Sequence, residues 1–259
     1  MSDSPALLNC IGLTVEIDGL TVVRNLDLAL RPGQCWCLLG RNGVGKTTLL
    51  HALAGLRPTR SGTLQLGGQP LHGLSRKQIA QRLGILLQHH NDSFPASVRE
   101  TVLQGRHPYL HAWQWETSQD HQLVTALLRK LALENLQARN VQTLSGGERQ
   151  RVAVATLLAQ QTSVLLLDEP VNHLDVKHRL GLLGTLDSDY RAQGCAVLLS
   201  LHDINLAVRF CDHALLLLGD GEVRQGPVDE ILDVPTLEAV YGYPLIELET
   251  PGGRAWLPR

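Results

Sequence analysis

The stretch that decides the fold lies at residues 40–48 and reads Gly40-Arg41-Asn42-Gly43-Val44-Gly45-Lys46-Thr47-Thr48. It fits the pattern G-x-x-x-x-G-K-[ST], a glycine-rich loop (P-loop) that binds nucleotide phosphates. Glycines lack a Cβ atom, so backbone N–H groups can turn inward and approach the phosphates closely. Lys46 adds a compact positive charge for the β- and γ-phosphates, and Thr47 supplies a hydroxyl group for Mg²⁺. The stretch therefore predicts a nucleotide-phosphate site.

The residues on either side of this loop supply the context that the motif requires. Residues 35–39 are apolar and indicate a buried strand, and residues 46–53 indicate a helix whose positive dipole end faces the phosphates. A plain glycine-rich turn before a helix is the simpler alternative, and the flanking strand and helix argue against it.

Composition limits the classes of protein that the chain can belong to. Its 259 residues are 44% hydrophobic, which is enough for a large buried core. The net charge of −2 provides no basic field for nucleic acid. We expect no signal peptide, since no basic start and apolar run are present, and no apolar stretch approaches the length of a membrane span. Any membrane role is expected to be peripheral, through a partner.

Cysteine and histidine do not form a pattern that is typical of a metal site. The five cysteines lack metal-binding spacing, so we expect reduced, small, buried apolar residues. Among the eleven histidines, His89 and His90 are adjacent and would point apart on a strand. No carboxylate or cysteine cluster completes a site around them.

The patterns along the chain predict an α/β fold with a mainly parallel, P-loop (RecA-like) sheet core. Short alternating stretches at 13–17, 21–23, 26–30 and 63–66 predict an N-terminal antiparallel β subdomain. Helical periodicity at residues 97–104 and 119–131 predicts a helical insertion. The resulting division is a single domain over residues 5–245, with 5–88 and 162–245 forming the β subdomain and P-loop core, 89–161 the helical subdomain, and 246–259 a C-terminal tail.

Two further apolar strands end in polar side chains. Residues 164–167 run directly into Asp168 and Glu169, and residues 196–199 lead through Ser200 and Leu201 to His202. Open α/β sheets bind ligands where the carboxyl ends of their strands meet. Asp168 is therefore expected to hold Mg²⁺, directly or through water, Glu169 to polarise the attacking water, and His202 to contact the γ-phosphate.

The stretch from Leu144 to Gln150 predicts a second anion site. Ser145 and Glu148 match a capping box at the start of a helix, which explains those two residues structurally. Gly146 and Gly147 are poor helix formers and are not explained by capping. Two glycines in a first turn expose backbone N–H groups that can meet an anion.

With these motifs in this order, the chain resembles the nucleotide-binding subunits of ABC transporters over nearly its whole length. The matching segments are the Walker A loop at 40–48, the Q-loop residue Gln88, the signature at 144–150, the Walker B end at Asp168-Glu169, the D-loop at 172–175, and the switch residue His202. The signature separates this family from other P-loop proteins.

The resemblance implies a mechanism, a set of partners and a location. Two copies would face head to tail and bury two ATP molecules, each held by one P-loop and closed by residues Ser145, Gly146, Gly147 and Glu148 of the other copy. Lys46, Glu169 and His202 would be catalytic, and Thr47, Gln88 and Asp168 would surround Mg²⁺. The partners would be integral membrane permease subunits and, indirectly, a substrate-binding protein, at the cytoplasmic face of the cell membrane.

One position departs from the family pattern. Ile17 stands where the family usually stacks an aromatic residue on adenine. Such stacking is worth about 1–3 kcal/mol. We therefore expect at most an aliphatic contact from Ile17 to contribute to the affinity for the base and to the selectivity for adenine.

Residues 105–109 narrow the class of transporter. Gly105-Arg106-His107-Pro108-Tyr109 resembles the GR-x-P-H segment of importers for ferric siderophores, haem and cobalamin, with Tyr109 where histidine is usual. An ordinary surface turn that caps a helix is the alternative. The predicted function is an ATP-binding and ATP-hydrolysing subunit of a metal-chelate importer. A soluble ABC ATPase in translation or repair usually has tandem cassettes, and Glu169 and His202 argue against a regulatory module that binds ATP without hydrolysis.

A surface that couples this subunit to the membrane partner is predicted on the helical insertion. The candidate residues mix apolar and cationic groups, as an interface would. They are Val98, Arg99, Leu103, Arg106, His107 and Tyr109. The alternative is that Arg106 and Tyr109 brace the insertion internally.

Overall fold

The computed structural model describes residues 4–88, 95–111, 113–250 and 253–259. At its centre is a six-stranded sheet in the order β10-β9-β3-β8-β7-β6. All neighbours pair in parallel except β10, which runs antiparallel to β9. The strands are β3 (Cys35–Gly40), β6 (Leu83–Leu86), β7 (Val164–Leu167), β8 (Ala196–Ser200), β9 (His213–Gly219) and β10 (Glu222–Pro227). This sheet confirms the mainly parallel core.

The N-terminal β subdomain is antiparallel, as predicted, but its strands are longer than the sequence pattern indicates. Its order is β2-β1-β4-β5, with β1 at Leu8–Ile17, β2 at Leu20–Leu30, β4 at Ser61–Leu66 and β5 at Gln69–Pro70. The three short stretches expected within residues 7–30 are in fact two continuous strands. Register shifts between β1 and β2 and the left-handed Asn25 (φ 52°) break the alternation of side chains without ending the strands.

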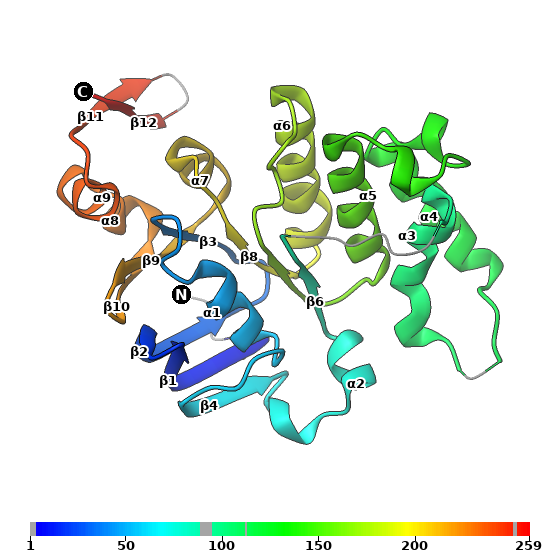
Figure 1. Ribbon diagram of the computed structural model, residues 1–259, viewed down its shortest axis with the longest axis horizontal. Helices are drawn as coiled ribbons and strands as arrows, with labels where there is room; N and C mark the ends of the chain where they lie inside the picture. The colour runs from blue at the N-terminus through cyan, green and yellow to red at the C-terminus, as the bar shows by residue number, and fades with distance from the viewer. Residues whose placement is uncertain (1–3, 89–94, 112, 251–252) are drawn as a thin grey trace.

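The helical subdomain lies to the right of the central sheet in Figure 1. Its main helices are α3 (Val98–Leu103), α4 (Ser118–Lys130) and α5 (Gly146–Ala159). Helix α3 ends at Leu103, one residue before the predicted end, and the chain continues as a 3-10 helix, η2 (Gln104–Tyr109). Gly105 is packed against α5, where a Cβ atom would lie 2.2 Å from the Thr156 carbonyl oxygen. Close packing against α5 therefore requires glycine at this position.

The remaining helices complete the layers around the sheet. They are α1 (Lys46–Leu53), α2 (Arg76–Ala80), α6 (Val176–Thr185), α7 (Ile204–Phe210), α8 (Val228–Ile231) and α9 (Val234–Tyr241). Shorter helical turns are η1 (Leu71–Gly73), η3 (Glu134–Leu136), η4 (Val141–Thr143) and the π-helical η5 (Leu186–Arg191). Helix α1 begins at Lys46 and ends at Leu53, which confirms the helix predicted after the P-loop.

In the region expected as a C-terminal tail, two strands pair as a β-hairpin. Its strands are β11 (Leu245–Thr250) and β12 (Gly253–Pro258), and Figure 1 shows it beside α7. The side chain of Asn205 in α7 accepts a hydrogen bond from the Trp256 N–H (2.8 Å) and donates one to the Trp256 carbonyl oxygen (3.2 Å). Trp256 is 3% exposed, so the end of the chain is docked on the main body.

Two hydrophobic clusters cover the two faces of the central sheet. Along β3 the side chains alternate between them: Cys35, Cys37 and Leu39 belong to the cluster under the helices, and Trp36 and Leu38 to the cluster under α1 and the antiparallel sheet. All five cysteines are free and buried, which confirms their use as small apolar residues. No helix in the described part of the chain is both long and apolar enough to cross a membrane.

Candidate nucleotide-binding site

A cavity of about 510 Å³ lies at the start of α1, beyond the carboxyl ends of the central strands. Residues from the P-loop, from the segments after β6, β7 and β8, and from the D-loop line it together. They are Asn42, Gly43, Gly45, Lys46, Thr47, Thr48, Gln88, Glu169, Asn172 and His202. The topology thus brings together side chains that are as far as 160 positions apart in the sequence, because β3, β8 and β7 are neighbours in the sheet.

Gly45 shows why the loop before α1 requires glycine. Its φ of 107° lies in a region that side chains rarely adopt, and a Cβ atom there would stand 2.4 Å from Cγ1 of Val22. Strand β2 therefore supports the loop from below. Val22 lies two residues after Leu20, where β2 begins.

Lys46 is held against the inside of the P-loop. Its side-chain Nζ atom donates to the carbonyl oxygens of Gly40 (2.9 Å) and Arg41 (3.2 Å), and the residue is 6% exposed. Burial lowers the pKa of Lys46 below its ordinary value, and the nearby carboxylates of Glu169 and Asp168 oppose that effect. A buried ammonium group at the bottom of a loop of N–H groups is a site for a multiply charged anion.

Thr47 and Asp168 connect the P-loop to β7. The Thr47 hydroxyl donates to Oδ2 of Asp168 at 2.5 Å, and Asp168 is 1% exposed behind the cavity wall. Hydroxyl, carboxylate and amide oxygens are the ligands that Mg²⁺ takes in nucleotide sites. The oxygens of Thr47, Asp168 and Gln88 therefore suit Mg²⁺.

Glu169 is the meeting point of the polar side chains around the cavity. Its Oε1 atom lies 2.6 Å from Nε2 of His202, and its Oε2 atom accepts a hydrogen bond from the Gln88 side chain at 3.1 Å. The side-chain amide of Asn172 also donates to Oε2. A carboxylate held by three side chains points in one direction, which suits a group that orients and deprotonates a water molecule.

Two residues at this site were not among the predicted site residues. Asn172 was noted only as part of the D-loop, and Ser200 only as the end of a strand. Ser200 is fully buried, donates to Oδ1 of Asp168 at 2.7 Å and accepts from the Glu169 N–H at 2.8 Å. The available sequence signal was a hydroxyl group closing an otherwise apolar strand, which by itself does not reveal its partners.

The signature residues do not line this cavity. Ser145 caps α5 and forms the predicted capping box with Glu148, whose backbone N–H donates to the Ser145 hydroxyl at 3.3 Å. Hydrogen bonds from the Ser145 N–H and hydroxyl hold the pKa of Glu148 below its ordinary value. Gly146 and Gly147 form the first turn of α5, where a Cβ atom on Gly147 would lie 2.8 Å from the His173 carbonyl oxygen. Close packing against the D-loop therefore also requires glycine here.

Ile17 also lies outside the lining of the cavity. It is the last residue of β1, pairs with Leu20 across the turn, and packs partly buried against the cluster beneath α1. His89 and His90 fall outside the described residues.

The prediction that six residues of the helical insertion form a coupling surface is wrong for four of them. Val98 and Leu103 are buried. Arg106 pairs with Asp120 at 2.6 Å, with side-chain exposures of 12% and 10%, and also donates to the Ala159 carbonyl oxygen at 2.8 Å. The Tyr109 hydroxyl donates to the Gln160 carbonyl oxygen at 2.7 Å under the Arg106 guanidinium. Arg106 and Tyr109 are internal braces that tie η2 to α4 and to the end of α5.

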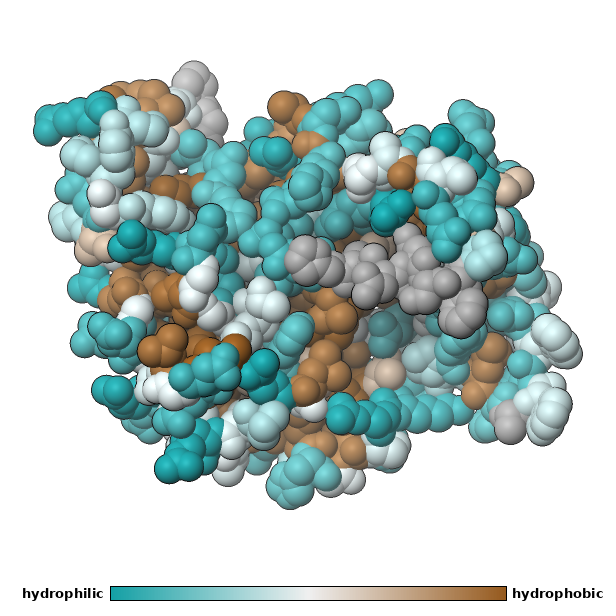
Figure 2. Space-filling model, in the orientation of Figure 1, coloured by the Kyte–Doolittle hydropathy of each residue, from teal (hydrophilic) through white to brown (hydrophobic). Residues whose placement is uncertain are grey.

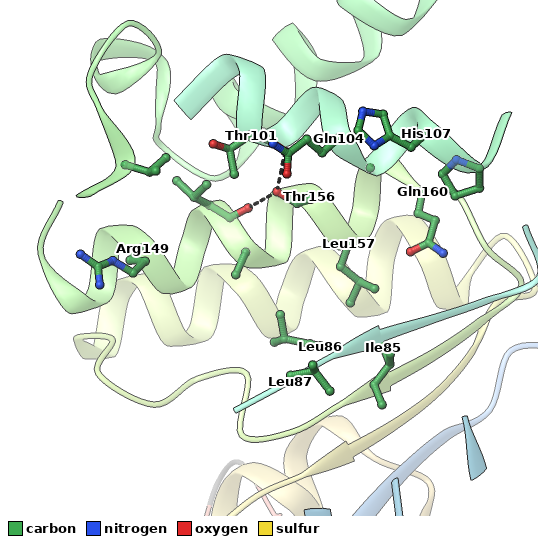
Figure 3. Close-up of a pocket in the computed structure, with 15 residues that line it drawn as sticks. Ile85, Leu86, Leu87, Thr101, Gln104, His107, Arg149, Thr156, Leu157 and Gln160 are labelled. Carbon is green, nitrogen blue, oxygen red and sulfur yellow. Dashed lines mark hydrogen bonds between the residues drawn. The ribbon is translucent and has the colours of Figure 1, made fainter. Parts of the chain in front are cut away.

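A groove of about 540 Å³ is lined by residues of both the helical subdomain and the end of β6. In Figure 3, Thr101, Gln104 and His107 lie at the top, Thr156 and Leu157 of α5 and Gln160 just after it lie beneath them, and Ile85, Leu86 and Leu87 lie at the bottom. Figure 2 shows hydrophobic residues gathered over β6 in the middle of a mostly polar face. His107 is the one member of the predicted coupling set that lines this groove.

Comparison with known proteins places this fold and site in a family. Residues 23–172 match the ABC transporter domain family. The chain is 34% identical to the ferric enterobactin transport ATP-binding protein FepC of Escherichia coli, over 97% of this chain and 93% of that protein. It is 38% identical to the hemin import ATP-binding protein HmuV of Bordetella pertussis, over 91% and 92% of the two chains.

Solved structures agree with the sequence relatives. A metal-chelate type ABC transporter in an inward-facing conformation superposes with a TM-score of 0.84 at 26% identity, covering 98% of both chains. An ATP-binding cassette in its ADP conformation superposes with a TM-score of 0.77 at 17% identity, covering 92% of this chain and all of that one, and this likeness shows the fold alone. The chain therefore belongs to the ABC transporter family, as an ATP-binding and ATP-hydrolysing subunit.

Proposed function

We propose that this subunit binds ATP with Mg²⁺ and uses its hydrolysis to energise the uptake of a metal chelate through integral membrane permease subunits. Ferric siderophores, haem and cobalamin are the cargo class, because the relatives are named for ferric enterobactin, achromobactin, hemin and cobalamin. The observation that carries the ATPase part is the convergence of Lys46, Glu169 and His202 on one cavity. The subunit would work at the cytoplasmic face of the membrane, with a substrate-binding protein delivering the cargo.

The charged and polar residues in and behind the cavity have distinct roles in this proposal. Lys46 and the N–H groups of the P-loop bind the β- and γ-phosphates. Thr47, Asp168 and Gln88 would hold Mg²⁺, which neutralises charge on those phosphates when bound. Glu169 takes the proton of the attacking water. His202, already in contact with Glu169, orients the γ-phosphate.

A second copy of the chain would complete the site. Ser145, Gly146, Gly147 and Glu148 stand at the N-terminus of a 14-residue helix, away from the cavity of their own chain. A helix N-terminus with exposed N–H groups binds phosphate. Two copies placed head to tail would set each signature against the ATP on the partner's P-loop, which would explain why the four signature residues lie outside the cavity of their own chain.

The groove beside β6 is the proposed seat of the permease. Its wall contains apolar residues such as Leu157 and Pro108 together with polar ones such as Gln104, a mixture that suits an interface core and rim. Strand β6 ends two residues before Gln88, whose side chain contacts Glu169. A segment of the permease in this groove would therefore respond to the state of the nucleotide site.

Uptake into proteoliposomes tests the proposed function. The subunit is reconstituted with the permease and the substrate-binding protein encoded beside it, and entry of ferric enterobactin, haem and cyanocobalamin is measured with and without ATP and Mg²⁺. We expect ATP-dependent entry of one of these chelates and none with Lys46→Ala, which removes the cation at the phosphates. ATP hydrolysis without entry of any chelate would contradict the proposed cargo class.

The groove is tested with Ala153→Arg. Ala153 is a partly exposed residue of α5 on the groove wall, so a long cationic side chain there would fill the groove. We expect the variant to lose co-purification with the permease, measured in detergent, while ATP affinity remains as the check on folding. Arg129→Ala, on the outer surface of α4, is the matched control and should co-purify normally. Normal co-purification of Ala153→Arg would exclude the groove as the docking site.

A further inference from the structure

Ser200 occupies an unusual position for a hydroxyl group. It is the last residue of β8, fully buried, in a strand whose other four residues are Ala, Val, Leu and Leu. Burying a hydroxyl without hydrogen bonds is unfavourable. Ser200 makes two: its Oγ atom donates to Oδ1 of Asp168 at 2.7 Å and accepts from the N–H of Glu169 at 2.8 Å.

The backbone of Glu169 needs such support. Its φ of 51° is left-handed, a conformation that costs roughly 1–2 kcal/mol for a residue with a Cβ atom. Strain of this kind persists only where the surroundings hold it. This conformation turns the chain directly after β7, and it is in this conformation that the carboxylate meets His202 and Gln88. The backbone N–H of the strained residue is bound by Ser200.

The direction of the two hydrogen bonds matters. Asp168 is accepting at both carboxylate oxygens, from Thr47 at Oδ2 and from Ser200 at Oδ1. The Ser200 hydroxyl therefore donates its proton to Asp168, and a lone pair of the same oxygen accepts from the Glu169 N–H. One hydroxyl thereby joins the proposed magnesium carboxylate to the backbone of the proposed base.

We propose that Ser200 is a positioning residue for ATP hydrolysis: it holds Glu169 in the left-handed turn that aims the carboxylate at the attacking water. The proposal rests on the role proposed above for Glu169. Ser200 itself does not line the cavity and contacts no substrate. Its loss should therefore slow the chemical step while leaving nucleotide binding intact, since misplacing a reacting group by about 1 Å costs on the order of 100-fold in rate.

The central experiment compares Ser200→Ala with wild type. We expect kcat for ATP to fall about 10- to 100-fold with KM within about twofold. ATP affinity by equilibrium binding should be unchanged. An ATP-bound dimer should also accumulate in gel filtration, as it would for Glu169→Gln, because closure no longer leads to cleavage. A purely structural serine would instead lower the melting temperature and the ATP affinity together.

Two controls isolate the hydroxyl of Ser200. Ser163→Ala removes a serine hydroxyl that donates to the Arg82 carbonyl oxygen at 3.1 Å, just before β7 at the end of the strand opposite the cavity, and should leave kcat unchanged. In a Glu169→Gln background, adding Ser200→Ala should cause little further loss, because a residue that acts through Glu169 has nothing left to position.

The outcomes separate this inference from the proposed function. Normal turnover of Glu169→Gln would remove the proposed base itself. If Glu169→Gln hydrolyses ATP slowly but Ser200→Ala keeps the wild-type kcat, the positioning role alone is overturned. The same follows if the losses in kcat of the two single variants add fully in the double variant. If Ser200→Ala fails to fold, Ser200→Thr and Ser200→Cys decide the matter. The inference requires Ser200→Thr, which keeps the hydroxyl, to hydrolyse ATP with a higher kcat than Ser200→Cys, and the reverse order overturns it.

Discussion

At the scale of single residues, the site is made by the few positions that directly follow buried strands. Lys46, Asp168 and Glu169 belong to short local motifs, so their residue types can be recognised without a structure. Their environment is what the fold adds: burial lowers the pKa of Lys46, and four groups fix the backbone and carboxylate of Glu169. Ile17 is the position where the local pattern departs from the family, which usually has an aromatic residue there. The Ile17 side chain does not line the cavity.

Replacement of Ile17 by tyrosine tests the adenine position. Ile17 lies at the β1–β2 turn, and β2 touches the P-loop through Val22. If adenine sits at this turn, Ile17→Tyr should tighten ATP binding by up to about 1–3 kcal/mol through stacking and raise the preference for ATP over GTP. Equilibrium binding of both nucleotides measures this.

Ile11→Tyr is the matched control for this prediction. Ile11 lies on the same strand and is 55% exposed, so a tyrosine there should change neither affinity nor base preference. Weaker ATP binding by Ile17→Tyr, or an unmoved preference, would mean that the base lies elsewhere.

At the scale of elements, the helical subdomain is held by a buried ion pair that the sequence did not reveal. Arg106 of η2 and Asp120 of α4 are both about nine-tenths buried, and Arg106 also ties α5 through the Ala159 carbonyl oxygen. Arg106→Ala should lower the stability by about 3–5 kcal/mol, because it leaves Asp120 buried without its partner. Thermal and urea unfolding of the isolated subunit measure the loss.

The same subdomain contains an exposed ion pair, Arg129–Glu134, for comparison. Arg129 and Glu134 have side-chain exposures of 74% and 51%, so Arg129→Ala should cost only about 0–1 kcal/mol. Equal losses for the two arginine variants would show that the buried pair does not brace the subdomain.

The Arg106–Asp120 pair also predicts a dependence of stability on pH. Burial raises the pKa of Asp120, but hydrogen bonds from Thr117 and Arg106 outweigh it and hold this pKa below the ordinary value. The contribution to stability is therefore complete above the unfolded pKa of about 3.9 and is lost as the pH falls through the lower folded value. The difference in stability between wild type and Asp120→Asn, followed by urea unfolding, should shrink as the pH falls below about 4.

At the scale of the whole molecule, the signature residues lie outside the cavity of their own chain, and this predicts an ATP-dependent dimer. Glu169→Gln should bind ATP normally, hydrolyse it about 10²–10⁴-fold more slowly, and elute as a dimer with ATP in gel filtration. Ser145→Arg added to this variant should return it to monomer while its own P-loop still binds ATP. A Glu169→Gln protein that stays monomeric with ATP would contradict the head-to-tail arrangement.

The sequence alone determined the parts that depend on local pattern. The P-loop and α1, the capping box at Ser145, and the buried strands at 164–167 and 196–199 follow from residue types within a few positions. The order of these motifs was enough to indicate the family and the parallel core, because such motifs require a particular strand or helix on each side.

The tertiary structure decided what depends on contacts between distant residues. The sequence favoured a coupling interface for Arg106, with an internal brace as the alternative, and its burial became favourable through acceptors as far away as Asp120 and the Ala159 carbonyl oxygen. The docking of Trp256 on Asn205 turned an expected tail into a hairpin. Ser200 gained its place beside Glu169 because β8 lies next to β7. Hydrogen-bond partners of this kind are set by the packing of elements far apart in the sequence, which no local pattern encodes.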